Sequence, residues 1–198
     1  MRGVARKTFE EFIIFKYFIP YAIMKLNASY LGLAAFALTT FVLSMANIGV
    51  IKSDVVIPLA FFYGGMAQFA AGMFSFKADD NFGGTAFSSY GAFWLSFGLM
   101  KLLEKFGDYE PSPAEIGVML IAWGIFTLYM WVPSLKIGKV LSLVFLTLWL
   151  TFFILGASAI YGYSTKLGGY VGMICALLAW YVSFAGITSE IYQKKLPL

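Results

Sequence analysis

Uncharged polar side chains stand beside aromatic rings at two places in the sequence. Residues 61–68 read Phe-Phe-Tyr-Gly-Gly-Met-Ala-Gln, and residues 81–94 read Asn-Phe-Gly-Gly-Thr-Ala-Phe-Ser-Ser-Tyr-Gly-Ala-Phe-Trp. In the second stretch Phe87, Tyr90 and Trp94 recur at i, i+3 and i+7, so in a helix the three rings share one face. Hydroxyls, amides and rings in this arrangement can bind a small polar solute, although hydrogen bonding between helices explains the same residue types.

The residue types that carry most catalysis and metal binding are scarce. The sequence has no histidine and one cysteine, Cys175, and neither a nucleophile motif nor a phosphate-binding loop occurs. The net charge of +4 comes from lysines and arginines placed at connections and termini, where such residues set membrane topology. We therefore predict no enzyme, no cofactor, no metal site and no nucleic-acid partner.

The composition places these residues in a membrane. Of 198 residues, 61% are hydrophobic and 12% are charged, against roughly 45–50% and 25% in soluble domains. Six charge-free runs, each long enough to cross a bilayer as a helix, cover residues 26–51, 55–76, 81–100, 116–135, 140–165 and 167–189. We predict an all-α membrane protein with one transmembrane domain over residues 26–192. Its six helices are expected at about 30–51, 55–76, 83–103, 115–135, 140–163 and 167–192.

The two ends of the chain differ from the spans. Residues 1–25 are rich in aromatic side chains but interrupted by charges, which predicts an N-terminal interfacial amphipathic helix; a seventh, tilted span is the alternative. Residues 193–198 form a short tail. Ten lysines and arginines fall on the side of the termini and four on the other side. This bias predicts a multi-pass protein of the cell membrane with both termini in the cytoplasm.

Three motifs resemble the acetate uptake transporter family, the acetate/succinate permeases of bacteria with their archaeal and fungal relatives. They are Phe-Tyr-Gly-Gly-Met-Ala-Gln at 62–68, the long string at 82–94 and Trp-Gly-Ile-Phe-Thr-Leu at 123–128. The family's first span opens with Asn-Pro-Ala-Pro-Leu-Gly-Leu, where residues 27–33 read Asn-Ala-Ser-Tyr-Leu-Gly-Leu. Both prolines are missing, which restores two amide donors and changes how the helix begins.

The resemblance implies a pore in each protomer. It implies six transmembrane helices around that pore, assembly as a homohexamer in the lipid bilayer, and an apolar constriction. The constriction would be formed by an aromatic residue of the first helix, the tyrosine of the Ser-Tyr-Gly motif and a leucine of the fifth helix. Matched along the chain, these positions are Phe36, Tyr90 and Leu148.

The expected function is transport of acetate through this narrow, channel-like pore. The dicarboxylate succinate and small monocarboxylates other than acetate are further candidate substrates, and any proton coupling would be carried by the substrate. Asn27, Gln68, Ser89 and the hydroxyls of Tyr63 and Tyr90 are expected to donate hydrogen bonds to a passing carboxylate. The full set of candidate binding and pore residues is Asn27, Tyr63, Gln68, Phe87, Ser89, Tyr90 and Trp94. A channel for urea, short amides or ammonia is the alternative function, and a scaffold without transport is a third.

Overall fold

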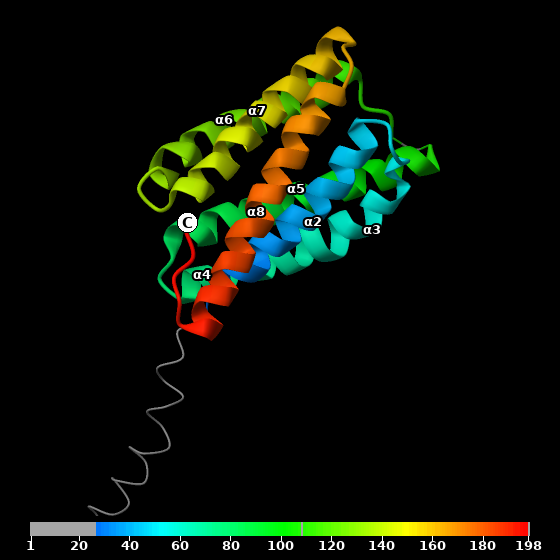
Figure 1. Ribbon diagram of the computed structural model, residues 1–198. Helices are drawn as coiled ribbons and strands as arrows, with labels where there is room; N and C mark the ends of the chain where they lie inside the picture. The colour runs from blue at the N-terminus through cyan, green and yellow to red at the C-terminus, as the bar shows by residue number, and fades with distance from the viewer. Residues whose placement is uncertain (1–26, 108, 198) are drawn as a thin grey trace, which may run out of the picture.

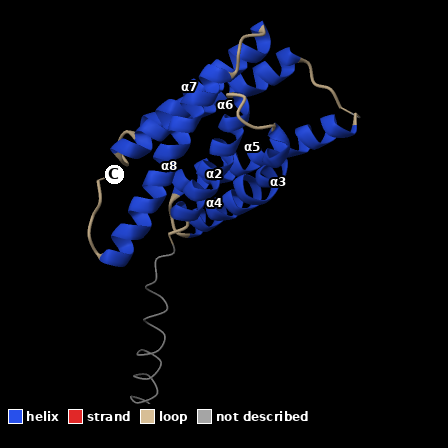
Figure 2. Cartoon of the chain, turned by 45° about the vertical axis from the view of Figure 1, so that its right-hand side comes forward, coloured by secondary structure: helices blue, strands red, loops and turns tan. Residues whose placement is uncertain are grey.

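The computed structural model describes residues 27–107 and 109–197, and these residues form helices and connecting loops without a strand (Figure 2). The elements are α2 (Ser29–Asn47), η1 (Ser53–Val55), α3 (Val56–Phe61), η2 (Phe62–Ala67), α4 (Gln68–Lys77), α5 (Asn81–Phe106), α6 (Pro113–Ser134), α7 (Lys139–Tyr161) and α8 (Lys166–Tyr192). The all-α fold predicted from the sequence is confirmed. The interfacial helix predicted for residues 1–25 lies outside the described residues.

The helices pack side by side in one bundle. The most extensive contacts pair α6 with α7 and α2 with α8, and α4 packs along α5. Figure 1 shows that the start of α2, the α4–α5 turn, the α6–α7 turn and the end of α8 all lie at one end of the bundle. Consequently α2, α5 and α7 run in the same direction, so side chains from these three helices can line one passage from end to end.

The described helices are long enough to span a bilayer. Five segments are both long and apolar enough to do so: Ser29–Asn47, Ser53–Lys77, Pro113–Ser134, Lys139–Tyr161 and Lys166–Tyr192. The remaining long helix, α5, has 26 residues, or about 39 Å of helix, against a hydrocarbon thickness of about 30 Å. It is less apolar because it carries three serines and, in its last two turns, the charged residues Lys101, Glu104 and Lys105. The protein is therefore a multi-pass membrane protein whose most polar long helix is α5.

The second predicted span contains a π-helical turn. Within Ser53–Lys77, residues Phe62–Ala67 form η2, and both central glycines of this turn are buried. A Cβ atom at Gly64 would lie 2.7 Å from the Oγ1 atom of Thr39 on α2. The glycine therefore permits a close approach between the two helices. Such single π turns are often found at functional sites, and this one directly precedes Gln68.

Alanine at Gly91 is expected to destabilise the bundle more than alanine at Gly98 of the same helix. A Cβ atom at Gly91 would lie 2.6 Å from the backbone nitrogen of Phe69, which cannot move without shifting α4. At Gly98 the nearest atom is the Cβ of Ala60 at 3.1 Å, a milder contact that the propensity gain of about 1 kcal/mol offsets. Overpacking costs about 1–3 kcal/mol, and the same propensity gain of about 1 kcal/mol applies at Gly91, so a net loss of up to about 2 kcal/mol should lower the midpoint of thermal unfolding of Gly91→Ala in detergent by up to about 8 °C. Equal shifts for the two variants would contradict the close α4–α5 contact.

Candidate transport pathway

Two cavities lie inside the bundle, one toward each end. The cavity nearer the start of α2, here the Asn27 cavity, has a volume of about 310 Å³ and is lined by side chains that include Asn27 and Gln68. The other, here the Asn47 cavity, has a volume of about 400 Å³ and reaches Asn47 and Lys101. Most of the lining of both cavities is apolar, which suits a pathway for a small solute.

Three residues line both cavities and therefore lie at their boundary. They are Phe36 of α2, Tyr90 of α5 and Leu148 of α7, each no more than 5% exposed. The ring centroids of Phe36 and Tyr90 are 6.0 Å apart. We call these three residues the neck. The structure thus brings together the three positions that the family resemblance implied, from helices that lie far apart in the sequence.

The aromatic face of α5 runs along this pathway. Phe87 lines the Asn27 cavity, Tyr90 lines both cavities, and Trp94 lines the Asn47 cavity. Because α5 is a regular helix from Asn81 to Phe106, the i, i+3, i+7 spacing gives the three rings one shared face, as the sequence pattern predicts. The indole Nε1 of Trp94 is buried without a hydrogen-bond partner among the described residues.

The hydroxyl of Tyr90 is engaged by the protein. It donates a hydrogen bond to Oγ1 of Thr127 at 3.0 Å, and that hydroxyl donates in turn to the carbonyl of Trp123 at 2.7 Å. The ring is also held edge-on by Phe126, with centroids 5.4 Å apart. Sequence reasoning treated this hydroxyl as a donor to the solute. In the structure its hydrogen bond to α6 fixes the position of the ring, and a role as donor to the solute stays a prediction.

Gln68 is an unpaired amide beside a cavity. The residue is 1% exposed and lines the Asn27 cavity, and neither its Oε1 nor its Nε2 has a hydrogen-bond partner among the described residues. A buried polar group left without a partner costs about 1–3 kcal/mol. An amide kept at this cost in a membrane bundle is a strong candidate for a group that meets the solute.

Of the other predicted pore residues, Asn27 lines a cavity, whereas Tyr63 and Ser89 do not. Asn27 is exposed at the start of the Asn27 cavity, and its Oδ1 accepts a hydrogen bond from the backbone of Ser29 at 3.1 Å. Tyr63 and Ser89 line neither cavity, so neither residue borders the pathway formed by the two cavities. For Ser89 the reason is its position on α5, because it precedes Tyr90 by one residue and its side chain is therefore rotated by about 100° around the helix from that of Tyr90.

Two threonines that line the Asn47 cavity are not in the set of candidate pore residues chosen from the sequence. Thr40 lines this cavity one helical turn beyond Phe36, and its hydroxyl is buried without a partner among the described residues. Thr151 lines it one turn beyond Leu148. Thr40 follows Phe36 by four residues and Thr151 follows Leu148 by three. Residues at these spacings share a helix face, so the two threonines could have been identified from the neck residues.

Apolar helices that enclose two cavities joined at a narrow neck define a membrane protein of the channel or transporter class. Residues 16–194 match the GPR1/FUN34/yaaH family, and the chain belongs to this family. The family resemblance identified from the sequence motifs is thereby confirmed.

Two characterised proteins and one solved structure are similar to most of the chain. The succinate-acetate/proton symporter SatP of Escherichia coli K12 is 37% identical over 177 residues, covering 87% of this chain and 94% of SatP. Accumulation of dyads protein 2 of Saccharomyces cerevisiae is 41% identical over 187 residues; the chain spans 66% of its length, and 87% of the chain is matched. The solved structure of the bacterial acetate channel SatP superposes with a TM-score of 0.85 at 36% identity, covering 87% of this chain and 98% of that one.

Proposed function

We propose that the protein transports acetate across the cell membrane, from one cavity through the neck to the other. The observation that carries this proposal is that, among the described residues, Phe36, Tyr90 and Leu148 are the ones that line both cavities. A solute crossing between the cavities must pass these three side chains. The similarity to proteins named as an acetate symporter and an acetate channel supports acetate as the solute.

Acetate must lose its water to pass an apolar neck. An acid with a pKa near that of glutamate, about 4.3, is only a few parts per thousand neutral at pH 7, and the anion is costly to dehydrate. The amides of Gln68 and Asn27 can replace part of that water in the Asn27 cavity, and the hydroxyl of Thr40 can do so beyond the neck. None of the described residues of the neck carries a charge, so a proton that crosses the neck would travel on the substrate itself.

Orientation and assembly are further parts of the proposal. The excess of lysine and arginine on the side of the termini supports a cytoplasmic location for both ends. The homohexamer follows from the family resemblance, and an exposed apolar stripe along η2 and α4, which repeats at spacings of four and three residues, is a surface on which a neighbouring protomer can pack. The stripe consists of Phe62, Met66, Phe69, Met73 and Phe76. Such a stripe suits packing against a neighbouring helix.

Uptake of labelled acetate into proteoliposomes tests the proposed function. We expect initial rates at least about tenfold above those of protein-free liposomes, with faster uptake when the lumen is made alkaline, because neutral acid that enters then releases its proton inside. Osmotic swelling in urea should match that of protein-free liposomes. Swelling in urea without acetate uptake would favour a channel for neutral solutes, and the absence of both would favour a scaffold.

A further inference from the structure

A third cavity adjoins the Asn27 cavity at the end of the bundle. It has a volume of about 510 Å³, and its polar lining consists of Asn27, Ser29, Ser75, Asp79, Asp80 and Glu190. We call this cavity the acidic mouth. Asn27, Ser29 and Asp80 also line the Asn27 cavity, so the acidic mouth lies at the entrance to the pathway.

Two of its three carboxylates are fixed by the α4–α5 turn. Asp79 has a positive φ of 61°, a conformation that aspartate tolerates better than most residues. Asp80 is the N-cap of α5, and its Oδ1 accepts a hydrogen bond from the backbone nitrogen of Gly83 at 2.9 Å. The third carboxylate, Glu190, comes from the last turns of α8. Two segments distant in the sequence, the α4–α5 turn and the end of α8, therefore place three carboxylates around one opening.

An unpaired serine points to a solute in this cavity. Ser75 is 2% exposed and lines the acidic mouth, and its Oγ has no hydrogen-bond partner among the described residues. Ser75 follows Gln68 by seven residues on α4, so the two side chains share one face of the helix. Unpaired hydrogen-bonding groups thus lead from the acidic mouth into the Asn27 cavity.

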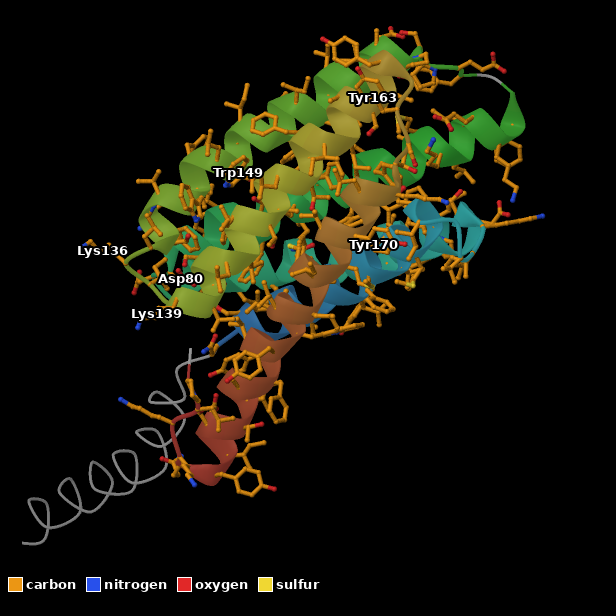
Figure 3. The ribbon with its side chains drawn as sticks, turned by 45° about the horizontal axis from the view of Figure 1, so that its top comes forward. Asp80, Lys136, Lys139, Trp149, Tyr163 and Tyr170 are labelled. Atoms are coloured by element: carbon orange, nitrogen blue, oxygen red, sulfur yellow. The ribbon has the colours of Figure 1, made fainter. Side chains whose placement is uncertain are left out.

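Ion pairs do not neutralise the carboxylates within the described part of the chain. The ion pairs between described residues are Lys101–Glu104 and Lys105–Asp54, and neither reaches the acidic mouth. Figure 3 shows Lys136 of the α6–α7 turn and Lys139 at the start of α7 at the same end as Asp80. Lys77 at the end of α4 and Lys194 and Lys195 after α8 belong to this end too, but none of these lysines lines the cavity. The described residues also contain no group of three or more acidic or cysteine side chains that could hold a metal ion.

We propose that the acidic mouth is a charge filter that admits small monocarboxylates and rejects dicarboxylates such as succinate. This inference rests on the proposed function. Repulsion between charges scales with their product, so a dianion is repelled about twice as strongly as a monoanion, and a neutral acid is not repelled. The hydroxyl of Ser75 and the amide of Asn27 can bind one carboxylate group. A second carboxylate on the same solute still faces the three negative charges.

Charge-neutral variants of the mouth test the filter. In Asp79→Asn/Asp80→Asn/Glu190→Gln the side chains keep their size, and asparagine serves as an N-cap as well as aspartate does. We expect the ratio of initial uptake rates of labelled succinate and labelled acetate to rise about tenfold in proteoliposomes. The matched control is Asp54→Asn at the opposite end of the bundle, which should leave the ratio unchanged. An unchanged ratio in the triple variant would overturn the filter.

Measuring the succinate-to-acetate uptake ratio of the parent protein at increasing salt concentrations tests the charge filter even if the triple variant fails to fold. The Debye length falls from about 20 Å at about 20 mM salt to about 4 Å at about 0.5 M, so screening should raise the succinate-to-acetate ratio of the parent. The triple variant, where it folds, should show no such rise. A parent ratio that is flat or falling with salt overturns the filter while acetate uptake stands. A parent without acetate uptake overturns the proposed function and the filter with it.

Discussion

Leu148→Ala is expected to raise the ratio of lactate uptake to acetate uptake about tenfold or more. Leu148 is 5% exposed and belongs to the neck, so its side chain limits the width of the passage. Forcing one extra carbon and its hydroxyl past a close-packed contact costs about 1–3 kcal/mol, and a relief of 1.4 kcal/mol is a factor of ten in rate. Initial rates with labelled lactate and acetate in proteoliposomes measure the ratio.

The control for this experiment lies on the same helix. Leu143→Ala makes the identical chemical change at an exposed position of α7 that lines neither cavity, and the ratio should stay within about twofold of the parent value. Phe36→Ala widens the neck from the side of α2 and should act in the same direction as Leu148→Ala. Lactate and acetate rates that change in equal proportion in both neck variants would remove these residues from the selectivity step.

The neck shows how far sequence reasoning reaches in this protein. The spacing of Phe87, Tyr90 and Trp94 predicts one helix face, and the structure places that face along both cavities. The pairing of Phe36 with Leu148 is different, because no local pattern connects residues of α2 and α7 that are more than one hundred positions apart. Their meeting follows from the packing of whole helices, and the family resemblance was the source of that expectation.

Other features had no sequence signal. The π turn of η2 depends on how Gly64 meets Thr39 of α2, which periodicity cannot show. Glu190, one position beyond a charge-free run, is the kind of residue expected at a solvated helix end, yet it shares a cavity with Asp79 and Asp80. Likewise the hydroxyl of Tyr90 could only be assigned once its distance to Thr127 was known. All three features are set by contacts between helices that are distant in the sequence.

Tyr30, at the start of α2, makes a contact that the sequence also could not predict. Tyr30 stands where the family's first-span signature has its second proline, and it lines the Asn27 cavity. Its ring occupies the space that a side chain at Gly186 of α8 would need. The backbone carbonyl of Tyr30 also accepts a hydrogen bond from Ser183 at 2.8 Å. The loss of the prolines is thus accompanied by an aromatic contact between α2 and α8.

Gln68→Leu is expected to lower acetate uptake about tenfold while raising the thermal stability of the protein. The amide has no partner among the described residues, so an apolar side chain of similar volume removes an unmet hydrogen-bonding requirement of about 1–3 kcal/mol. At about 2–4 °C per kcal/mol, the unfolding midpoint in detergent should rise by several degrees. The same change deprives a carboxylate in the Asn27 cavity of a donor worth about 1.5–3 kcal/mol, which lowers its rate of passage.

The opposite signs of these two effects separate a transport role from a structural one. Thr39→Val is the matched control, because it also removes a buried polar group from the bundle. The hydroxyl of Thr39 donates to the carbonyl of Ala35 at 3.0 Å and lines neither cavity, so its loss should leave acetate uptake within about twofold and should not raise the unfolding midpoint. If Gln68→Leu lowers stability and uptake together, the amide is a structural group. If it raises stability and leaves uptake unchanged, acetate passes without meeting the amide, because a donor used during passage cannot be removed without cost to the rate.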